Sequence, residues 1–154
     1  MMGKLRSLLT PLLAESEQPQ DDMSLDLAVA VLMVEMARAD NNLADAEERE
    51  IRDQLQGAFG LNAASAEQLV LRAHDTVEDA VSLHEFTRVV HEGMDYAEKQ
   101  RVMKMLWQVA LTDRNLDKYE DYLIGKVGEL LYVSRGDVIR LRNQVMEDLA
   151  AQDR

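Results

Sequence analysis

The chain has 154 residues, 47% of them hydrophobic and 30% charged, which is enough for one folded domain with a sizeable core. Its 29 acidic and 17 basic side chains give a net charge of −12, which disfavours binding to nucleic acid or to anionic lipid. The sequence has no cysteine, and this excludes disulfides, thiolate zinc sites and cysteine nucleophiles. Only two prolines, seven glycines and 5% aromatic residues favour an all-α fold.

The first 22 residues are predicted to form a short amphipathic helix followed by a polar linker. One helical stripe carries five leucines, and Pro11 interrupts it: Leu5, Leu8, Leu9, Leu12 and Leu13. We expect this helix to pack onto the main domain, with a weak interface for a membrane or a partner helix as the alternative. The main domain is predicted to span residues 23–150.

Two segments, residues 25–39 and 95–111, are apolar on nearly every face. A helix of that kind is central and buried, so we expect both to form the core, with Trp107 inside it. The first segment contains Asp26, Glu35 and Arg38 and is too short to cross a bilayer, so no stable membrane insertion is expected. Methionines on both segments are expected to fill gaps in this core.

Capping residues mark the starts of most predicted helices. Ser24, Asn62, Asp95, Asp117 and Ser134 each precede a helical pattern, and Ser82 with Glu85 matches the S-x-x-E capping box. Gly57 and Gly60 lie where a helix near residues 45–58 ends. Gly125 and Gly128 share a helix face and suggest a close helix contact. The sequence predicts seven or eight helices and no strand.

Two acidic segments, residues 39–48 and 112–121, each follow one of the apolar helices. They align at an offset of 113 − 40 = 73 residues, with Asp40 matched to Asp113, Asn42 to Asn115 and Glu47 to Glu120. The chain is therefore predicted to be a compact bundle built from a duplicated helix–acidic loop–helix unit.

The spacing in the second segment suits a hard cation. Asp113, Asn115 and Asp117 occupy alternate positions, and Glu120 follows, so that several side-chain oxygens suitable for Ca²⁺ lie close together. An EF-hand is excluded, since its glycine and glutamate positions hold Lys118 and Ile124.

The first segment offers fewer donors, among them Asp40, Asn42 and Glu47, because Ala44 replaces the residue matched to Asp117. A second interpretation needs no metal. Glu47 and Glu120 occupy the third helical position, where glutamate caps a helix, and the loop carboxylates accept backbone N–H groups.

The residues around these acidic segments resemble a known family. Residues 37–47 and 109–120 are similar to the duplicated A-D-G-x-[IL]-x-x-x-E signature of TerB-like proteins, and the likeness extends over residues 23–148. Asp40, Glu47, Asp113 and Glu120 match its acidic positions, while Asn41 and Arg114 replace its glycine. The resemblance implies an all-α stand-alone bacterial protein linked to tellurite and chemical-stress resistance. It also implies a metal-binding or sensing role, and protein interaction of the kind seen for related domains beside DnaJ-type co-chaperones.

No nucleophile or phosphate-binding motif occurs, and His84 and His91, seven residues apart, lack the H-E-x-x-H spacing of zinc enzymes. We therefore expect a non-catalytic, cytoplasmic protein, a monomer or weak homodimer, that does not bind nucleic acid. Two hypotheses follow. In one, the paired loops hold a divalent cation, Ca²⁺ by ligand type. In the other, they cap helices of a metal-free scaffold that binds a protein partner.

Overall fold

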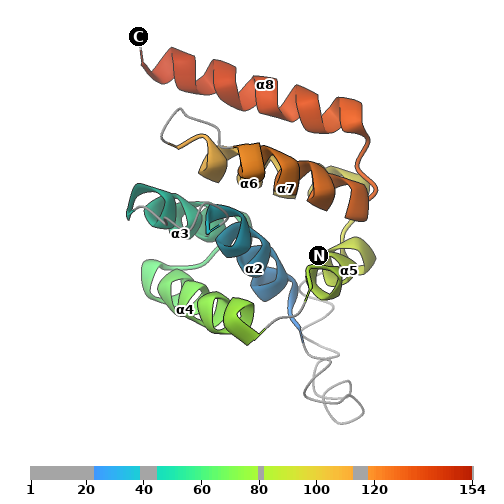
Figure 1. The fold of residues 1–154 in the computed structure, drawn as a ribbon. Helices are drawn as coiled ribbons and strands as arrows, with labels where there is room; N and C mark the ends of the chain where they lie inside the picture. The colour runs from blue at the N-terminus through green and yellow to red at the C-terminus, as the bar shows by residue number, and fades with distance from the viewer. Residues whose placement is uncertain (1–22, 39–44, 80–81, 113–117, 154) are drawn as a thin grey trace.

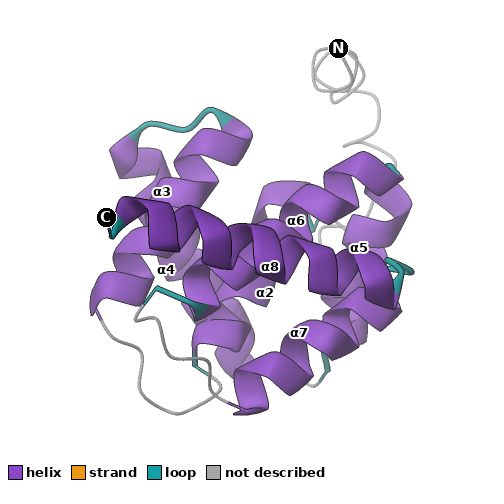
Figure 2. Ribbon diagram, turned by 90° about the horizontal axis from the view of Figure 1, so that it is seen from above, coloured by secondary structure: helices purple, strands orange, loops and turns teal. Residues whose placement is uncertain are grey.

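The computed structural model describes residues 23–38, 45–79, 82–112 and 118–153, and over these ranges it contains seven helices and no strand (Figures 1 and 2). The predicted all-α fold is thus confirmed. The predicted N-terminal helix and linker lie outside the described residues. The helices are α2 (Leu25–Ala37), α3 (Asp45–Phe59), α4 (Ala63–Asp79), α5 (His84–Gly93), α6 (Tyr96–Ala110), α7 (Lys118–Leu130) and α8 (Arg135–Gln152).

Helix α2 lies at the centre of the bundle and packs against α3, α4, α5, α6 and α7 (Figure 1). Ten of its thirteen residues are buried, which follows from its apolar side chains on every face. Helix α6, the second apolar segment, packs against α2, α3, α7 and α8. Both helices occupy the central positions that their sequences predict.

The duplication covers three helices rather than two. Helices α2–α3–α4 correspond to α6–α7–α8, since Glu47 and Glu120 are both third residues of their helices and Asn62 and Ser134 both precede the last helix of a unit. Helix α5 joins the two units. Figure 1 shows α4 and α8 at opposite ends of the molecule, with the central helices between them. Each outer helix packs on the central helix of its own unit.

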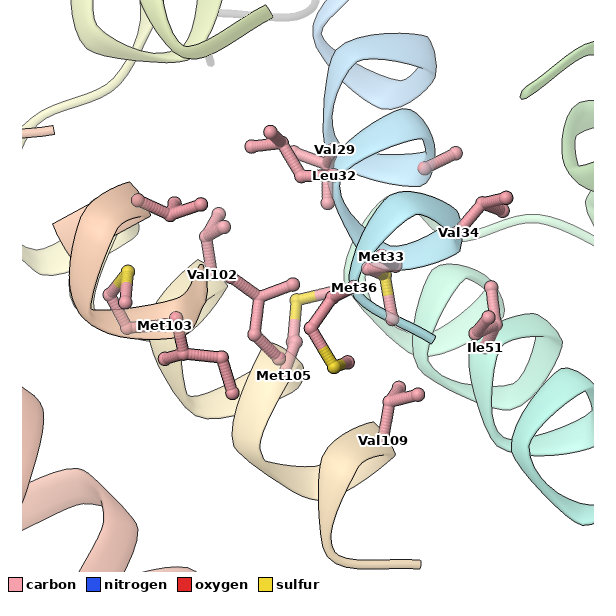
Figure 3. Close-up of a cluster of buried hydrophobic side chains, with 14 of the residues drawn as sticks. Val29, Leu32, Met33, Val34, Met36, Ile51, Val102, Met103, Met105 and Val109 are labelled. Atoms are coloured by element: carbon pink, nitrogen blue, oxygen red, sulfur yellow. The ribbon is translucent and has the colours of Figure 1, made fainter. Parts of the chain in front are cut away.

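Methionines contribute to the core between the two units (Figure 3). Met33 and Met36 of α2 and Met103 and Met105 of α6 are all buried, among aliphatic side chains from both helices. Their unbranched side chains adapt to irregular gaps, in agreement with the role predicted for them. Trp107 is buried as predicted, at 2% exposure.

Four of the predicted helix caps are present. Ser24, Asn62 and Ser134 each accept an N–H from the residue three positions later, at 3.4, 2.7 and 3.1 Å. Asp95 accepts the Glu98 N–H at 2.8 Å, and the Glu98 carboxylate accepts the Asp95 N–H at 2.9 Å, a complete capping box. Asp117 lies outside the described residues.

The capping box predicted at Ser82 is wrong. Helix α5 begins one residue later than expected, so that Leu83 occupies the N-cap and makes no side-chain capping bond. The Ser82 hydroxyl oxygen instead accepts the N–H of His84, two residues along, at 3.3 Å. Glu85 consequently lies at the second helical position and not at the third, which the reciprocal bond requires.

Helices α3 and α7 end in the same way but with different residues. Gly60 follows α3 with φ 65°, and Tyr132 follows α7 with φ 61°. In each case the N–H of the following residue donates a hydrogen bond to the carbonyl oxygen five residues earlier. Leu61 donates to Gln56 at 3.2 Å, and Val133 donates to Gly128 at 2.9 Å. These are Schellman caps, and Gly60 is the C-terminal glycine that the sequence predicts. Tyr132 adopts a conformation that usually favours glycine.

No helix of the described chain combines the length and apolar character needed to cross a membrane.

Candidate functional site

The start of α3 and the start of α7 each carry a buried glutamate. Glu47 is 6% exposed and Glu120 is 3% exposed, and each is the third residue of its helix. They are equivalent in the duplicated unit, 73 residues apart in the sequence. Both take part in interactions, so neither is an isolated carboxylate in the interior. Their burial places an acidic group at the same point in both halves of the molecule.

The desolvation cost of burying a carboxylate at such a position must be offset by other interactions. Removing a charged group from water costs several kcal/mol unless hydrogen bonds, an opposite charge or a metal ion offset the loss. The N-terminal end of a helix supplies part of this, because its free N–H groups and its dipole favour negative charge. Asp45 and Glu48 on α3, and Asp121 on α7, add further negative charge to the same first turns.

Glu98 offers a comparison within the same chain. It too is the third residue of a helix, α6, and it completes a capping box with Asp95. Yet Glu98 is exposed to solvent, whereas Glu47 and Glu120 are buried. Helix capping by glutamate in this protein therefore does not require burial.

The remaining predicted ligands cannot be placed beside these two glutamates. Asp40, Asn42, Asp113, Asn115 and Asp117 lie outside the described residues. Within the described ranges, no group of three or more histidine, cysteine or carboxylate side chains is arranged to hold a metal ion. The donor chemistry of Glu47 and Glu120, buried carboxylate oxygen, fits a hard divalent cation such as Ca²⁺.

A histidine lies beside the start of α3. His74 Nε2 of α4 is 3.0 Å from Glu48 Oε1 of α3, and this contact joins the two helices. His84 and His91 are both exposed. His91 Nδ1 also contacts Lys99 Nζ at 2.5 Å, and its ring lies 4.7 Å from that of Tyr132.

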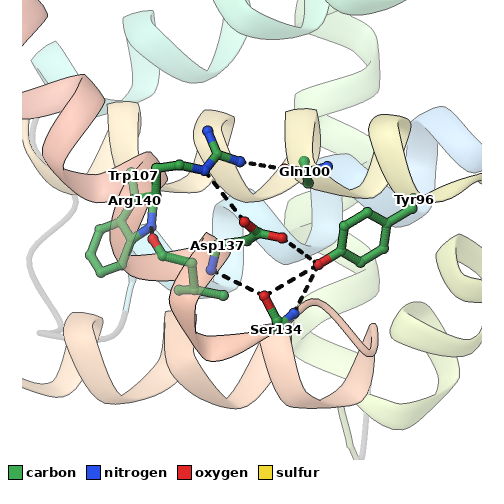
Figure 4. A network of polar contacts seen from close by, with 7 residues as sticks. Tyr96, Gln100, Trp107, Ser134, Asp137 and Arg140 are labelled. Carbon is green, nitrogen blue, oxygen red and sulfur yellow. Dashed lines mark hydrogen bonds and ion pairs between the residues drawn. The ribbon is translucent and has the colours of Figure 1, made fainter.

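A second polar cluster, which the sequence did not indicate, joins α6 to the start of α8 (Figure 4). Tyr96 Oη donates to Asp137 Oδ2 at 2.6 Å and accepts the Ser134 N–H at 3.1 Å. Arg140 contacts Asp137 at 3.3 Å and also donates to Gln100. The hydrogen bonds from Tyr96 and Ser134, followed by the nearby Arg140 charge, lower the pKa of Asp137 from its ordinary value.

This cluster has a structural explanation. Ser134 is the N-cap of α8 and Asp137 lies in its first turn, so that Tyr96 fastens the start of α8 to the start of α6. Of these residues, only Ser134 was identified from the sequence, as a helix cap. Nothing in the sequence pointed to Tyr96 as their partner, because forty-one residues separate it from Asp137.

A family model for tellurite resistance protein TerB matches residues 26–143. No curated protein and no solved structure matches the chain. The matched range runs from the first turn of α2 into α8, so that it includes both units and both buried glutamates. The chain therefore belongs to the tellurite resistance protein TerB family.

Proposed function

We propose that this TerB-family protein is a non-catalytic cation-binding protein of the tellurite or chemical-stress response. Its two acidic loops hold a divalent cation, Ca²⁺ by ligand type. Glu47 and Glu120 anchor the sites, and Asp40, Asn42, Asp113, Asn115 and Asp117 supply further oxygen ligands. The bound ion supplies the positive charge that offsets a buried carboxylate.

The observation that carries this proposal is the matched burial of Glu47 and Glu120 at equivalent positions. A carboxylate that only caps a helix can remain in water, as Glu98 does. Burial at equivalent positions in both halves of the duplicated unit supports a shared role for the two glutamates. Oxygen donors within a short loop followed by an inward glutamate are typical of sites for hard cations.

The rival proposal is a metal-free scaffold that binds a protein partner. Its support is the set of large exposed side chains on the last two helices and the turn between them: Tyr119, Tyr122, Tyr132, Ile139 and Met146. In that case Glu47 and Glu120 serve the fold alone, through backbone N–H groups at the helix starts.

Thermal unfolding with and without Ca²⁺, Mg²⁺, Mn²⁺ or Zn²⁺ separates the two proposals. An ion at about a hundred times its dissociation constant adds roughly 2.7 kcal/mol, which raises Tm by several degrees. We expect Glu47→Gln and Glu120→Gln to reduce this increase, and Asp113→Asn combined with Asp117→Asn to abolish the part due to the second loop.

Glu98→Gln is the matched control. It removes one charge from the same helical position, but from an exposed glutamate, so Tm falls slightly while the metal-dependent increase stays. If none of the four ions changes Tm and the Glu47 and Glu120 variants are simply less stable, the cation proposal is wrong and the scaffold proposal stands.

A further inference from the structure

A groove of about 460 Å³ lies on the second unit, between α7 and α8, with Trp107 of α6 among its lining residues. This volume is within the range of small-molecule sites, roughly 300–1,000 Å³. Glu47 and Glu120, the two predicted cation ligands that the structure describes, are not among its lining residues. A role for this groove rests on other residues than the two buried glutamates and goes beyond the function proposed above.

The charged side chains that line the groove in the described part of the chain have a net positive charge, opposite in sign to that of the whole chain. Four cationic side chains line it: Lys118, Lys126, Arg135 and Arg142. Two carboxylates, Asp121 and Glu129, do so as well, so the lining residues that the structure describes carry an excess of positive charge on a protein whose net charge is −12. One of these carboxylates is engaged, since Lys126 Nζ lies 3.9 Å from Glu129 Oε2. An excess of cations in a concave site attracts anions.

Arg142 carries a buried donor without an acceptor. Its Nε is inaccessible to solvent and has no hydrogen-bond partner in the structure. Buried N–H groups are nearly always paired, and leaving one unpaired is destabilising. The guanidinium group is a planar fork suited to the two oxygens of a carboxylate, phosphate or sulfonate.

Apolar and aromatic side chains form the rest of the groove. Tyr122 is 64% exposed and Ile139 is 37% exposed, and both line it together with the buried Val133 and Val138. The Tyr122 ring is stacked against that of Tyr119, with centroids 6.3 Å apart. Gly125 adds free space, because a Cβ at this position would meet nothing within 4 Å. A ligand with a flat apolar body fits such a surface.

The first unit lacks the two arginines and the tryptophan of the groove at the equivalent positions. Arg135 and Arg142 correspond to Ala63 and Val70, at the 72-residue offset of Asn62 and Ser134, and Trp107 corresponds to Val34 at the 73-residue offset. Both valines are buried in the core.

The contact between Glu48 of α3 and His74 of α4 in the first unit also has no counterpart in the second. Glu48 and His74 join α3 to α4, and their counterparts on α7 and α8 are Asp121 and the exposed Met146. The same fold can therefore be built without the groove, which is a feature of the second unit.

We propose that the α7–α8 groove binds a small organic anion, with its acidic head on Arg142 and Arg135 and an apolar, preferably aromatic, body against Tyr122 and Ile139. The excess positive charge selects the head group, and the apolar wall selects the body. A bare inorganic anion would use only the first of these contacts.

The probe for this proposal is 8-anilinonaphthalene-1-sulfonate, an aromatic anion whose fluorescence can be excited by energy transfer from the single tryptophan. Trp107 lines the groove, so a ligand bound there quenches its emission and fluoresces in turn. The comparison ligand is N-phenyl-1-naphthylamine, which has a similar aromatic body and no sulfonate. We expect saturable binding of the anion at one site per chain, and binding of the neutral compound at least about tenfold weaker, as loss of a charge-assisted hydrogen bond gives.

Substitutions at Arg142 and at Gly125 test whether the probe binds in the groove. Arg142→Gln should weaken binding at least about tenfold by removing the charged fork. Gly125→Leu should block the site sterically without changing charge, while Gly125→Ala should leave it open. Arg88→Gln is the matched charge control, since Arg88 is exposed on α5 and does not line the groove.

Far-UV circular dichroism and a melt of each variant show whether it is folded, and Arg135→Gln replaces Arg142→Gln if the latter does not fold. Equal affinity for the charged and neutral compounds would overturn the proposal. The proposal would also be overturned if the affinity for the anion were unchanged both in a folded arginine variant and in the Gly125→Leu variant.

Discussion

Tyr96 Oη lies 2.6 Å from Asp137 Oδ2 and donates a hydrogen bond to it, and this contact joins the first residue of α6 to the first turn of α8. The same phenol oxygen accepts the N–H of Ser134, the N-cap residue of α8. One exposed side chain thus fixes the start of the last helix on the central one. The first predictions concern this contact.

Tyr96→Phe should lower Tm by a few degrees at neutral pH, because it removes the donor to Asp137 and the acceptor for Ser134 while keeping the ring. Ser134→Ala is a useful comparison, as it removes the α8 cap but leaves the phenol in contact with Asp137. Melting curves followed by circular dichroism measure both. An unchanged Tm for Tyr96→Phe would mean that the contact contributes nothing to stability.

The pH dependence of this contribution follows from the lowered pKa of Asp137 in the folded protein. A carboxyl group with a lower pKa when folded stabilises the protein fully above its unfolded pKa, near pH 4, and loses that effect as the pH falls through the folded pKa. The Tm difference between wild type and Asp137→Asn should therefore be constant around neutrality and shrink below about pH 4. A difference that grows on acidification would contradict the assignment.

Gly128 and Gly125 of α7 should respond in opposite ways to the same substitution. A Cβ at Gly128 would lie 2.8 Å from Val138 Cγ2 of α8, too close without movement of one helix, so Gly128→Ala should destabilise the protein by about 1–3 kcal/mol. A Cβ at Gly125 meets nothing within 4 Å, so Gly125→Ala should stabilise it by about 1 kcal/mol through helix propensity. Urea unfolding of the two variants measures the difference. Equal effects would rule out the close contact between α7 and α8.

Tyr132 is expected to be strained where Gly60 is not. Both follow a helix with φ near +60°, a conformation that costs a residue with a side chain roughly 1–2 kcal/mol. Tyr132→Gly should therefore stabilise the protein by about 1 kcal/mol, reduced by loss of the ring contact with His91. Gly60→Ala should destabilise it by a similar amount. If Tyr132→Gly destabilises the fold instead, the contact with His91 outweighs the backbone strain.

The sequence was sufficient for features that depend on neighbours along the chain. Cap residues such as Ser24 and Asp95, and the terminal glycine Gly60, act within one turn of helix, and their positions were predicted correctly. The two buried helices were evident from their composition alone. The failure at Ser82 came from a shift of one residue in the start of α5, which local patterns do not determine.

Features formed between distant segments could not be predicted. The partnership of Tyr96 with Asp137 and the groove beside Arg142 depend on how α6, α7 and α8 lie against one another. Of the seven predicted cation ligands, only Glu47 and Glu120 lie in the described chain, and their burial could not be predicted from the local pattern. The close helix contact predicted for Gly125 and Gly128 is present at Gly128 and absent at Gly125.

The central position of α2 constrains how the duplicated chain can fold and diverge. Its side chains are buried by helices from both units, so neither unit alone can cover it. A fragment ending before α6 would leave this apolar surface in water, where it would promote aggregation and expose the chain to proteases. The two units have therefore become mutually dependent, and we expect the protein to unfold in one cooperative transition rather than half by half.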